Sequence, residues 1–181
     1  HDPVERESPL AVTLLQGIAR GERMDQAVQK ATELGVARIV PVAAERSVVQ
    51  LGEGRAGRRV AHWQAVAAAD CEQCGRNRVP EVTAPLSLAA ACEAAGAAML
   101  RGVLEPAAAR TLREAAAALP PRGATVALLV GPEGGLSDIE LAVAGRAGFE
   151  PLRLGPRVLR TETAGPAALA ALQALAGDLG D

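Results

Sequence analysis

Side chains able to do chemistry are concentrated near the end of the chain, in residues 154–166 (LGPRVLRTETAGP). This stretch carries two arginines, one glutamate and two threonines, more polar chemistry than a loop needs merely to reverse the chain. A guanidinium suits bidentate contact with a phosphate or a base edge. A carboxylate can accept a proton or pair with such a cation. We therefore expect the function to depend on this stretch.

Glycines mark a second segment, residues 130–135 (VGPEGG). Gly131, Gly134 and Gly135 leave little side chain between the backbone and a ligand, so bare N–H groups can approach a small molecule closely. The G-x-x-x-x-G-K-[ST] phosphate loop and the G-x-G-x-x-G dinucleotide turn are both absent from the sequence. Spacing alone supports a tight structural turn as well as it supports a ligand loop.

Both segments connect a predicted strand to a predicted helix. The apolar run 125–130 (TVALLV) is typical of a strand buried on both faces. The helix predicted over 136–147 begins with an S-x-x-E capping box formed by Ser137 and Glu140. The helix predicted over 165–176 is apolar nearly all round, which indicates burial in the core or in a subunit interface. Open α/β sheets usually bind their ligands at such strand-to-helix turns.

The rest of the chain alternates apolar, strand-like runs with segments of helical periodicity. We expect strands over 10–18, 36–42, 79–83, 97–104 and 150–154, helices over 22–34, 59–74, 86–95 and 107–119, and an exposed loop over 47–58. This alternation predicts an α/β fold, with a mostly parallel sheet and helices on both of its faces.

The composition limits the class of protein. The 181 residues suffice for one domain with a sizeable core, and 49% of them are hydrophobic and 22% charged. A formal net charge of -2 gives no sign of a strongly basic nucleic-acid binder, although a local patch can still steer a ligand. No apolar run approaches the ~20 residues needed to cross a bilayer, and three cysteines do not make a disulfide framework. We expect a cytoplasmic protein with no membrane partner.

Cys71 and Cys74 have the C-x-x-C spacing of zinc and redox sites. A zinc ion would need two further ligands, and beyond this pair the sequence offers only Cys92, His1 and His62. On a helix the two cysteines lie on one face. We interpret them as small buried side chains and expect no metal.

Four motifs, in order along the chain, resemble one family. They are MD…KATELGV (24–36), CEQCGRNRVP (71–80), GPEGGLSDIE (131–140) and LGPRVLRTETA (154–164). Together they are similar to the RsmE-type methyltransferases of the SPOUT (trefoil-knot) superfamily, which methylate N3 of a uridine in 16S ribosomal RNA of the small subunit. The resemblance covers nearly the whole chain.

The resemblance implies a C-terminal deep trefoil knot, in which the loop at Leu154 threads through the chain around Gly131, an exception to the rule that chains do not thread loops. It implies S-adenosylmethionine as the cofactor, bound in the knot largely by backbone groups. It also implies a homodimer with its active site at the subunit interface. The matching cofactor positions are Leu104, Glu105, Gly131, Pro132, Glu133, Gly134, Gly135, Leu154, Gly155, Val158, Leu159 and Arg160.

Methylation of uracil N3 requires loss of the N3 proton, so the site needs a proton acceptor and donors aimed at the flanking carbonyl oxygens. Glu162 is the candidate base, or it orients a water or a second residue that is. Arg160 or Arg157 would stabilise the anion or hold the RNA backbone. The alternative for Glu162 is a salt bridge to Arg157 or Arg160 that only shapes the loop.

Other candidate residues also have two interpretations. Glu133 fits a favourable charge at a helix N-terminus better than it fits catalysis. Thr161 and Thr163 could cap the last helix or touch the ligand. The resemblance points to an RNA-facing role, with a polar helix end as the alternative, for Glu72, Gln73, Arg76 and Arg78.

Members of this family usually begin with a PUA-type RNA-binding domain. This chain begins about where that domain should end, so we expect residues 1–181 to form the methyltransferase domain without it. Two other functions remain open at this point. One is another knotted methyltransferase, acting on transfer RNA or a ribose 2′-OH, and the other is a catalytically silent RNA-binding module.

Overall fold

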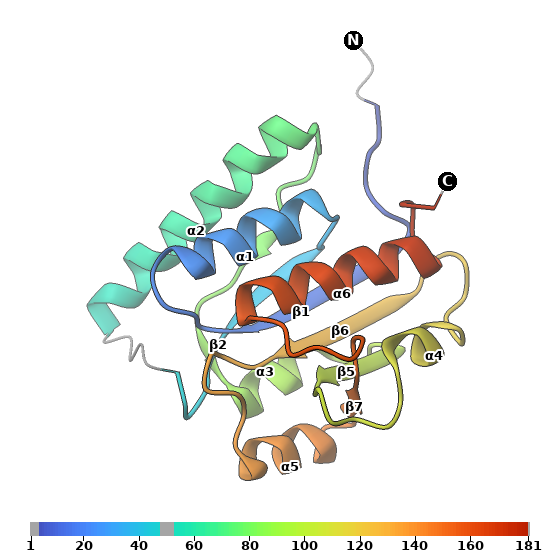
Figure 1. Ribbon diagram of the computed structural model, residues 1–181. Helices are drawn as coiled ribbons and strands as arrows, with labels where there is room; N and C mark the ends of the chain where they lie inside the picture. Colours follow the sequence, from blue (N-terminus) through green and yellow to red (C-terminus); the bar gives the residue numbers. More distant parts are fainter. Residues whose placement is uncertain (1–3, 48–52, 181) are drawn as a thin grey trace.

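A parallel sheet forms the centre of the protein (Figure 1), in a computed structural model that describes residues 4–47 and 53–180. Within these residues the strand order is β3-β2-β1-β6-β5-β7, with the short β4 also paired to β2, and every pairing is parallel. The elements are β1 (Ala11–Gly17), α1 (Glu22–Glu33), β2 (Arg38–Ala43), α2 (Glu53–Cys74), β3 (Glu81–Val82), β4 (Leu86–Ser87), α3 (Leu88–Ala94), β5 (Leu100–Leu104), α4 (Leu112–Ala116), β6 (Thr125–Val130), α5 (Asp138–Arg146), β7 (Glu150–Leu152) and α6 (Thr161–Ala176).

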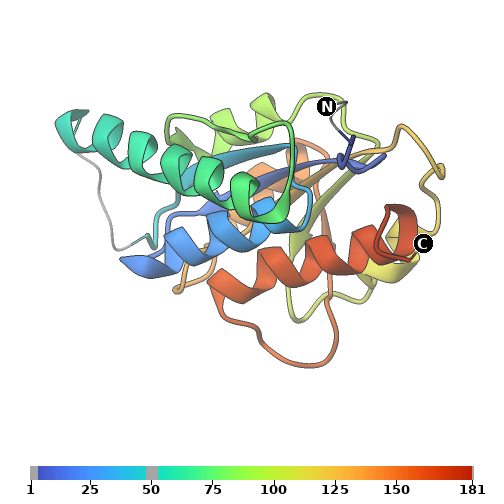
Figure 2. The same ribbon diagram turned by 90° about the horizontal axis from the view of Figure 1, so that it is seen from above.

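Helices cover both faces of the sheet, because alternate side chains of the central strands point to opposite sides. On one face, Val12 and Leu14 of β1 pack in a cluster with residues of α1, α2, α4 and α6. On the other face, Leu15 and Leu129 pack with residues of α3 and α5. Figures 1 and 2 show α1 lying between α2 and α6 on the first face. The predicted fold class is confirmed, and the knot stays a prediction.

Several element boundaries differ from the sequence prediction; the helix expected over 86–95, for example, is the strand β4 at 86–87 followed by α3 at 88–94. The loop expected over 47–58 is wrong for residues 53–58, which form the first turns of α2, while 48–52 lie outside the described residues. Gly54 and Gly57 made this segment look like a loop, but α2 packs along α1 and continues through them. The helix expected over 107–119 shortens to α4, because Thr111 caps it.

The last helix begins earlier than predicted. Gly165 and Pro166 suggested that the chain stays irregular up to residue 165, but α6 starts at Thr161. Glu162 therefore stands in the first turn of a helix, not in a loop. Buried Ala168, Leu169 and Leu172 face the sheet, so burial within the chain itself accounts for much of the apolar character of α6.

None of the helices in the described part of the chain combines the length and the apolar character required to cross a membrane. The Cys71 thiol is buried and donates a weak hydrogen bond of 3.7 Å to the carbonyl of Arg78. Burial raises the pKa of this thiol. Among the described residues, no three His, Cys, Asp or Glu side chains gather as a metal site would require.

The parallel sheet brings the carboxyl ends of β1, β5, β6 and β7 to one edge. There the last residue of β1, Gly17, touches the turn that follows β6. A Cβ added at Gly17 would lie 2.5 Å from the backbone N of Pro132 and 2.8 Å from the carbonyl carbon of Gly131. Only glycine permits this approach, which fixes the position of the turn relative to the central strand.

Substitution of Gly17 tests this contact. We expect Gly17→Ala to lower the free energy of unfolding by about 1–3 kcal/mol, because backbone atoms must move to admit the methyl group. Urea denaturation followed by circular dichroism measures the change. The control is Gly57→Ala, at an exposed position in α2 with open space around the added Cβ. It should stabilise the protein by roughly 0.5–1 kcal/mol. Equal denaturation midpoints for Gly17→Ala and the wild type would contradict the contact.

Candidate functional site

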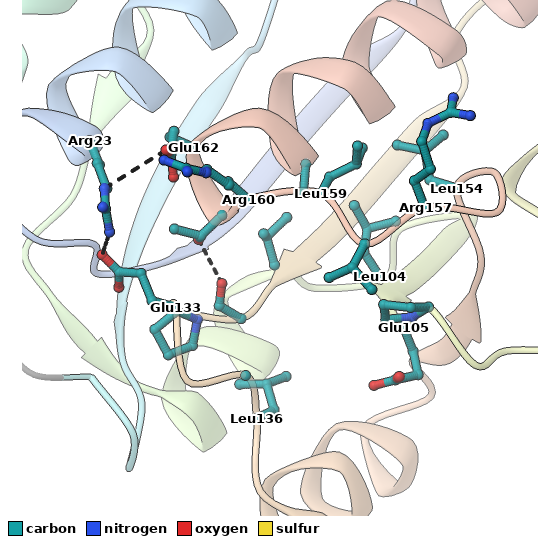
Figure 3. A pocket seen from close by; sticks show the side chains of 18 residues that line it. Arg23, Leu104, Glu105, Glu133, Leu136, Leu154, Arg157, Leu159, Arg160 and Glu162 are labelled. Carbon is teal, nitrogen blue, oxygen red and sulfur yellow. Dashed lines mark hydrogen bonds and ion pairs between the residues drawn. The ribbon is translucent and has the colours of Figure 1, made fainter.

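A cavity of about 430 Å³ opens at the carboxyl edge of the sheet. Its walls come from the end of β5, the glycine-rich turn after β6, the loop between β7 and α6, and the first turn of α6 (Figure 3). It is lined by Arg23, Leu104, Glu105, Pro106, Val130, Gly131, Pro132, Glu133, Gly135, Leu136, Leu154, Arg157, Val158, Leu159, Arg160, Thr161, Glu162 and Ala164. The two segments singled out in the sequence therefore form one site.

Most of the predicted cofactor positions line this cavity, with two exceptions. Gly134 points away from it, toward Arg46, whose guanidinium donates a hydrogen bond of 3.2 Å to the Gly134 carbonyl. Gly155 is exposed and does not line the cavity. Its φ of 70° allows the chain to turn at this position. Thr161, which could cap the last helix or touch the ligand, is among the lining residues, and the lining residues not predicted are Arg23, Pro106, Val130, Leu136 and Ala164.

Thr161 ties the two halves of the cavity together. Its hydroxyl donates a hydrogen bond of 2.7 Å to the carbonyl of Gly131 and accepts one of 2.9 Å from the side-chain amide of Gln16. The same amide also donates to the carbonyl of Gly17 at 3.1 Å. Thr161 is thus a structural residue that joins α6, the glycine-rich turn and β1, and it does not cap α6 with its side chain.

Glu162 pairs with an arginine that lies far from it in the sequence. Its Oε1 lies 3.8 Å from Nε of Arg23 in α1, so Arg23 takes the place that had been offered to Arg157 or Arg160. The other oxygen, Oε2, is buried and has no hydrogen-bond partner among the described residues. Arg23 also pairs with Glu133, at 3.2 Å between Nη1 and Oε1 (Figure 3). No local signal in the sequence links Arg23 to these two glutamates.

Glu133 is held ionised at the mouth of the cavity. Burial pushes the pKa of its carboxyl upward, but hydrogen bonds from the backbone N–H groups of Arg20 and Glu133 itself, together with the Arg23 guanidinium, outweigh burial. The net pKa lies below the ordinary value for a glutamate. Glu133 precedes α5 by several residues, and its carboxylate accepts a hydrogen bond from the N–H of Arg20, just before α1. It therefore stabilises the loop before α1 and does not interact with the N-terminus of α5.

Arg157 and Arg160 are both exposed on the rim of the cavity. Neither forms an ion pair within residues 4–47 and 53–180. Figure 3 shows Arg160 extending toward Glu162 and Arg157 extending away from the cavity. Between them Val158 is 80% exposed, an unusual position for an apolar side chain. The rim thus offers a partner an apolar contact and two cations that are not ion-paired with any described residue.

The candidate RNA-facing residues at the end of α2 lie elsewhere. The side chain of Arg76 is 5% exposed. Its guanidinium pairs with Glu7 and donates a hydrogen bond of 2.9 Å to the carbonyl of Thr32. Arg78 pairs with Glu5 at 3.1 Å. Because residues 5–7 precede β1, this cluster lies at the amino edge of the sheet, opposite the cavity. Glu72 and Gln73 are exposed beside it.

A parallel α/β sheet with a cavity between a glycine-rich turn and a polar loop places this protein among the open-sheet α/β proteins, which bind ligands at the carboxyl ends of their strands. The RNA methyltransferase domain family matches residues 6–173, and the chain belongs to this family. The chain is 39% identical to the ribosomal RNA small subunit methyltransferase E of Buchnera aphidicola subsp. Schizaphis graminum, over 96% of this chain and 69% of the relative. It is 36% identical to the enzyme of that name from Mycobacterium bovis, over 91% of this chain and 63% of the relative.

Solved structures agree with this assignment. The ribosomal RNA small subunit methyltransferase E of Neisseria gonorrhoeae, bound to S-adenosylmethionine, is 40% identical with a TM-score of 0.88, over 98% of this chain and 71% of that one. A Legionella pneumophila methyltransferase in complex with the same cofactor is 44% identical with a TM-score of 0.90, over 97% and 71%. A SpoU methyltransferase from Streptomyces viridochromogenes, at 13% identity and a TM-score of 0.55, shares the fold. The chain spans about two thirds of the length of its curated relatives.

The depressed pKa of Glu133 predicts a pH-dependent contribution to stability. A carboxyl with a lowered folded pKa stabilises the protein above its unfolded pKa of about 4.3, and this contribution is lost as the pH falls through the folded pKa. Glu133→Gln should therefore lower the free energy of unfolding at pH 7, by roughly 1 kcal/mol, and the difference from wild type should shrink as the pH falls below 4. Urea denaturation at several pH values measures both quantities.

The matched control is Glu93→Gln, because Glu93 is exposed on α3. We expect its free energy of unfolding to follow that of the wild type at every pH. A constant difference between Glu133→Gln and wild type from neutral to acid pH would contradict the assigned charge on Glu133.

Proposed function

We propose that this chain transfers the methyl group of S-adenosylmethionine to N3 of a uridine in 16S ribosomal RNA of the small subunit. The observation that carries the proposal is the buried, unpartnered Oε2 of Glu162, in the wall of a cavity of about 430 Å³. Relatives with this fold and with substantial identity are named ribosomal RNA small subunit methyltransferase E, and one of them is bound to S-adenosylmethionine. Such a substrate implies a cytoplasmic protein.

The cavity suits the cofactor in size and in charge. Small-molecule sites commonly measure about 300–1,000 Å³ and have mostly apolar walls with a few polar groups. Leu104, Leu154 and Leu159 supply apolar walls, while the carboxylate of Glu105 favours a cation. Gly135, at a φ of 70°, has nothing within 4 Å of its Cβ position, so the backbone there is open to a ligand. When bound, S-adenosylmethionine supplies a methyl group already activated by its sulfonium.

Glu162 would accept the N3 proton of the uracil. Its Oε2 has an unused acceptor site, and its Oε1 lies 3.8 Å from Arg23, which limits the directions that the carboxylate can take. Arg160 or Arg157 would donate hydrogen bonds to the oxygens over which the uracil anion spreads its charge, or hold the RNA backbone. The remaining rate gain comes from alignment, since a fixed carboxylate and a fixed cavity hold the reacting groups together.

The substitution Glu162→Gln tests the assigned base. Glutamine keeps the shape of the side chain but accepts protons poorly, so methyl transfer should fall by about 100-fold or more. Transfer of a labelled methyl group to assembled small subunits measures the rate, with bare transfer RNA as the competing substrate. Calorimetry should show affinity for S-adenosylmethionine within about twofold of the wild type.

Glu93→Gln is again the control and should leave both quantities unchanged. Undiminished transfer by Glu162→Gln would eliminate Glu162 as the base. No binding of S-adenosylmethionine to the wild type at millimolar concentration would favour a silent RNA-binding module, and faster methylation of transfer RNA would favour another substrate.

We also propose that the chain acts as a homodimer in which the second copy completes the RNA surface. Glu72, Gln73 and Arg78 lie at the sheet edge opposite the cavity, so they could serve the reaction of a neighbouring subunit but not that of their own. Arg76 is committed to Glu7 and contributes to the shape of this surface. Light scattering of the purified chain should give twice the monomer mass of 18.4 kDa. A mass of one monomer at micromolar concentration would contradict the dimer.

A further inference from the structure

A second groove lies beside the cavity, at the start of α1. It measures about 570 Å³ and is lined by Arg20, Gly21, Glu22, Arg23, Gln26, Arg160 and Glu162. Three of these residues, Arg23, Arg160 and Glu162, also line the first cavity. The two hollows are therefore adjacent, and Glu162 with its two neighbouring arginines forms the boundary between them.

The charges on this boundary are unevenly neutralised. Arg23 is paired with the carboxylates of Glu133 and Glu162. Arg20 and Arg160 are exposed, and neither is in an ion pair with any residue of the part of the chain that the structure describes. Two uncompensated guanidiniums thus face one groove, which otherwise offers Glu22 and the amide of Gln26.

The backbone at Arg20 is fixed, although its side chain is free. Its N–H donates a hydrogen bond of 3.0 Å to Glu133, and its carbonyl accepts one of 3.2 Å from the N–H of Arg23. Arg160 is equally anchored, because its carbonyl accepts the first hydrogen bonds of α6, from Thr163 and Ala164. Both cations are therefore carried on backbone that hydrogen bonds hold in place beside Glu162.

We propose that this groove binds a backbone phosphate of the RNA, next to the nucleotide whose base reaches Glu162. Guanidinium groups recognise phosphates by paired hydrogen bonds, and phosphate contacts set the position of a nucleic acid while the base provides specificity. The shared wall places a phosphate in the groove and a base at the unpartnered oxygen of Glu162 within one nucleotide chain. The proposal rests on the proposed function, and it adds Arg20 as a substrate-positioning residue.

The substitution Arg20→Gln tests the groove, because it removes the charge and keeps the backbone hydrogen bond to Glu133. The probe is a fluorescein-labelled oligouridine of about eight nucleotides, whose anisotropy reports binding to the full chain at several KCl concentrations. We expect roughly fivefold weaker binding and a salt dependence of log K reduced by about 0.7, the value for one phosphate contact on a single strand.

Arg122→Gln is the matched control, since Arg122 is exposed in the loop before β6, at the opposite edge of the sheet. It should bind oligouridine like the wild type. Equal affinity and equal salt dependence for Arg20→Gln and Arg122→Gln would overturn the proposal. Weaker binding of S-adenosylmethionine to Arg20→Gln in calorimetry, with oligouridine binding unchanged, would also overturn it and assign the groove to the cofactor.

Methyl transfer to small subunits separates this proposal from the one that it extends. In Arg20→Gln we expect a raised KM for the RNA and a nearly unchanged kcat. The phosphate contact stabilises the bound RNA and the transition state equally, so its loss weakens binding without slowing the chemical step. If the wild type binds oligouridine through Arg20 but methylates no small subunit, the groove stands and the proposed substrate fails. If the wild type methylates small subunits and Arg20→Gln does so with unchanged KM, the groove fails alone.

Discussion

The Thr161 hydroxyl makes the hydrogen bonds on which the rest of the site depends. It connects the amide of Gln16 in β1 to the carbonyl of Gly131 after β6. Thr161 and Gln16 lie 145 positions apart in the chain. Gln16 is fully buried and Thr161 is 6% exposed, so loss of a partner would leave polar groups buried without compensation. Because Glu162 follows Thr161 in the first turn of α6, the same bonds hold the backbone of Glu162 in place.

The charged side chains around Thr161 fall into two groups, one paired within the protein and one exposed. The carboxylates of Glu133 and Glu162 share Arg23, so this arginine is paired within the protein. Arg20, Arg157 and Arg160 are left on the exposed side, where an anionic partner can neutralise them. A protein with a formal net charge of -2 can in this way still present a local basic surface beside the cavity.

The sequence predicted the strands and the capped helix around the site well, because those signals are local. The apolar run of β6 and the capping box of Ser137 and Glu140 appear as expected. The start of α4 was missed although Thr111 and Glu114 carry the same T-x-x-E signal. The start of α6 was missed because Gly165 and Pro166 oppose a helix locally, while the contacts of Thr161 favour it over a long range. Arg23 could not be found, since only the fold brings α1 beside α6.

The pairing of β1 with β6 has a consequence for the synthesis of the protein. Strand β1 is made early, yet one of its two neighbours in the sheet, β6, is made late, with Ala11 paired to Thr125. During translation, the apolar strand β1 is therefore present without its neighbour β6 until most of the domain has been made. The pairing of β1 with β6 closes a long loop of chain. The conformational entropy of this loop is lost before the contacts between the two strands stabilise the fold, and this slows folding. Nascent chains of this protein should need protection from aggregation until β6 has emerged.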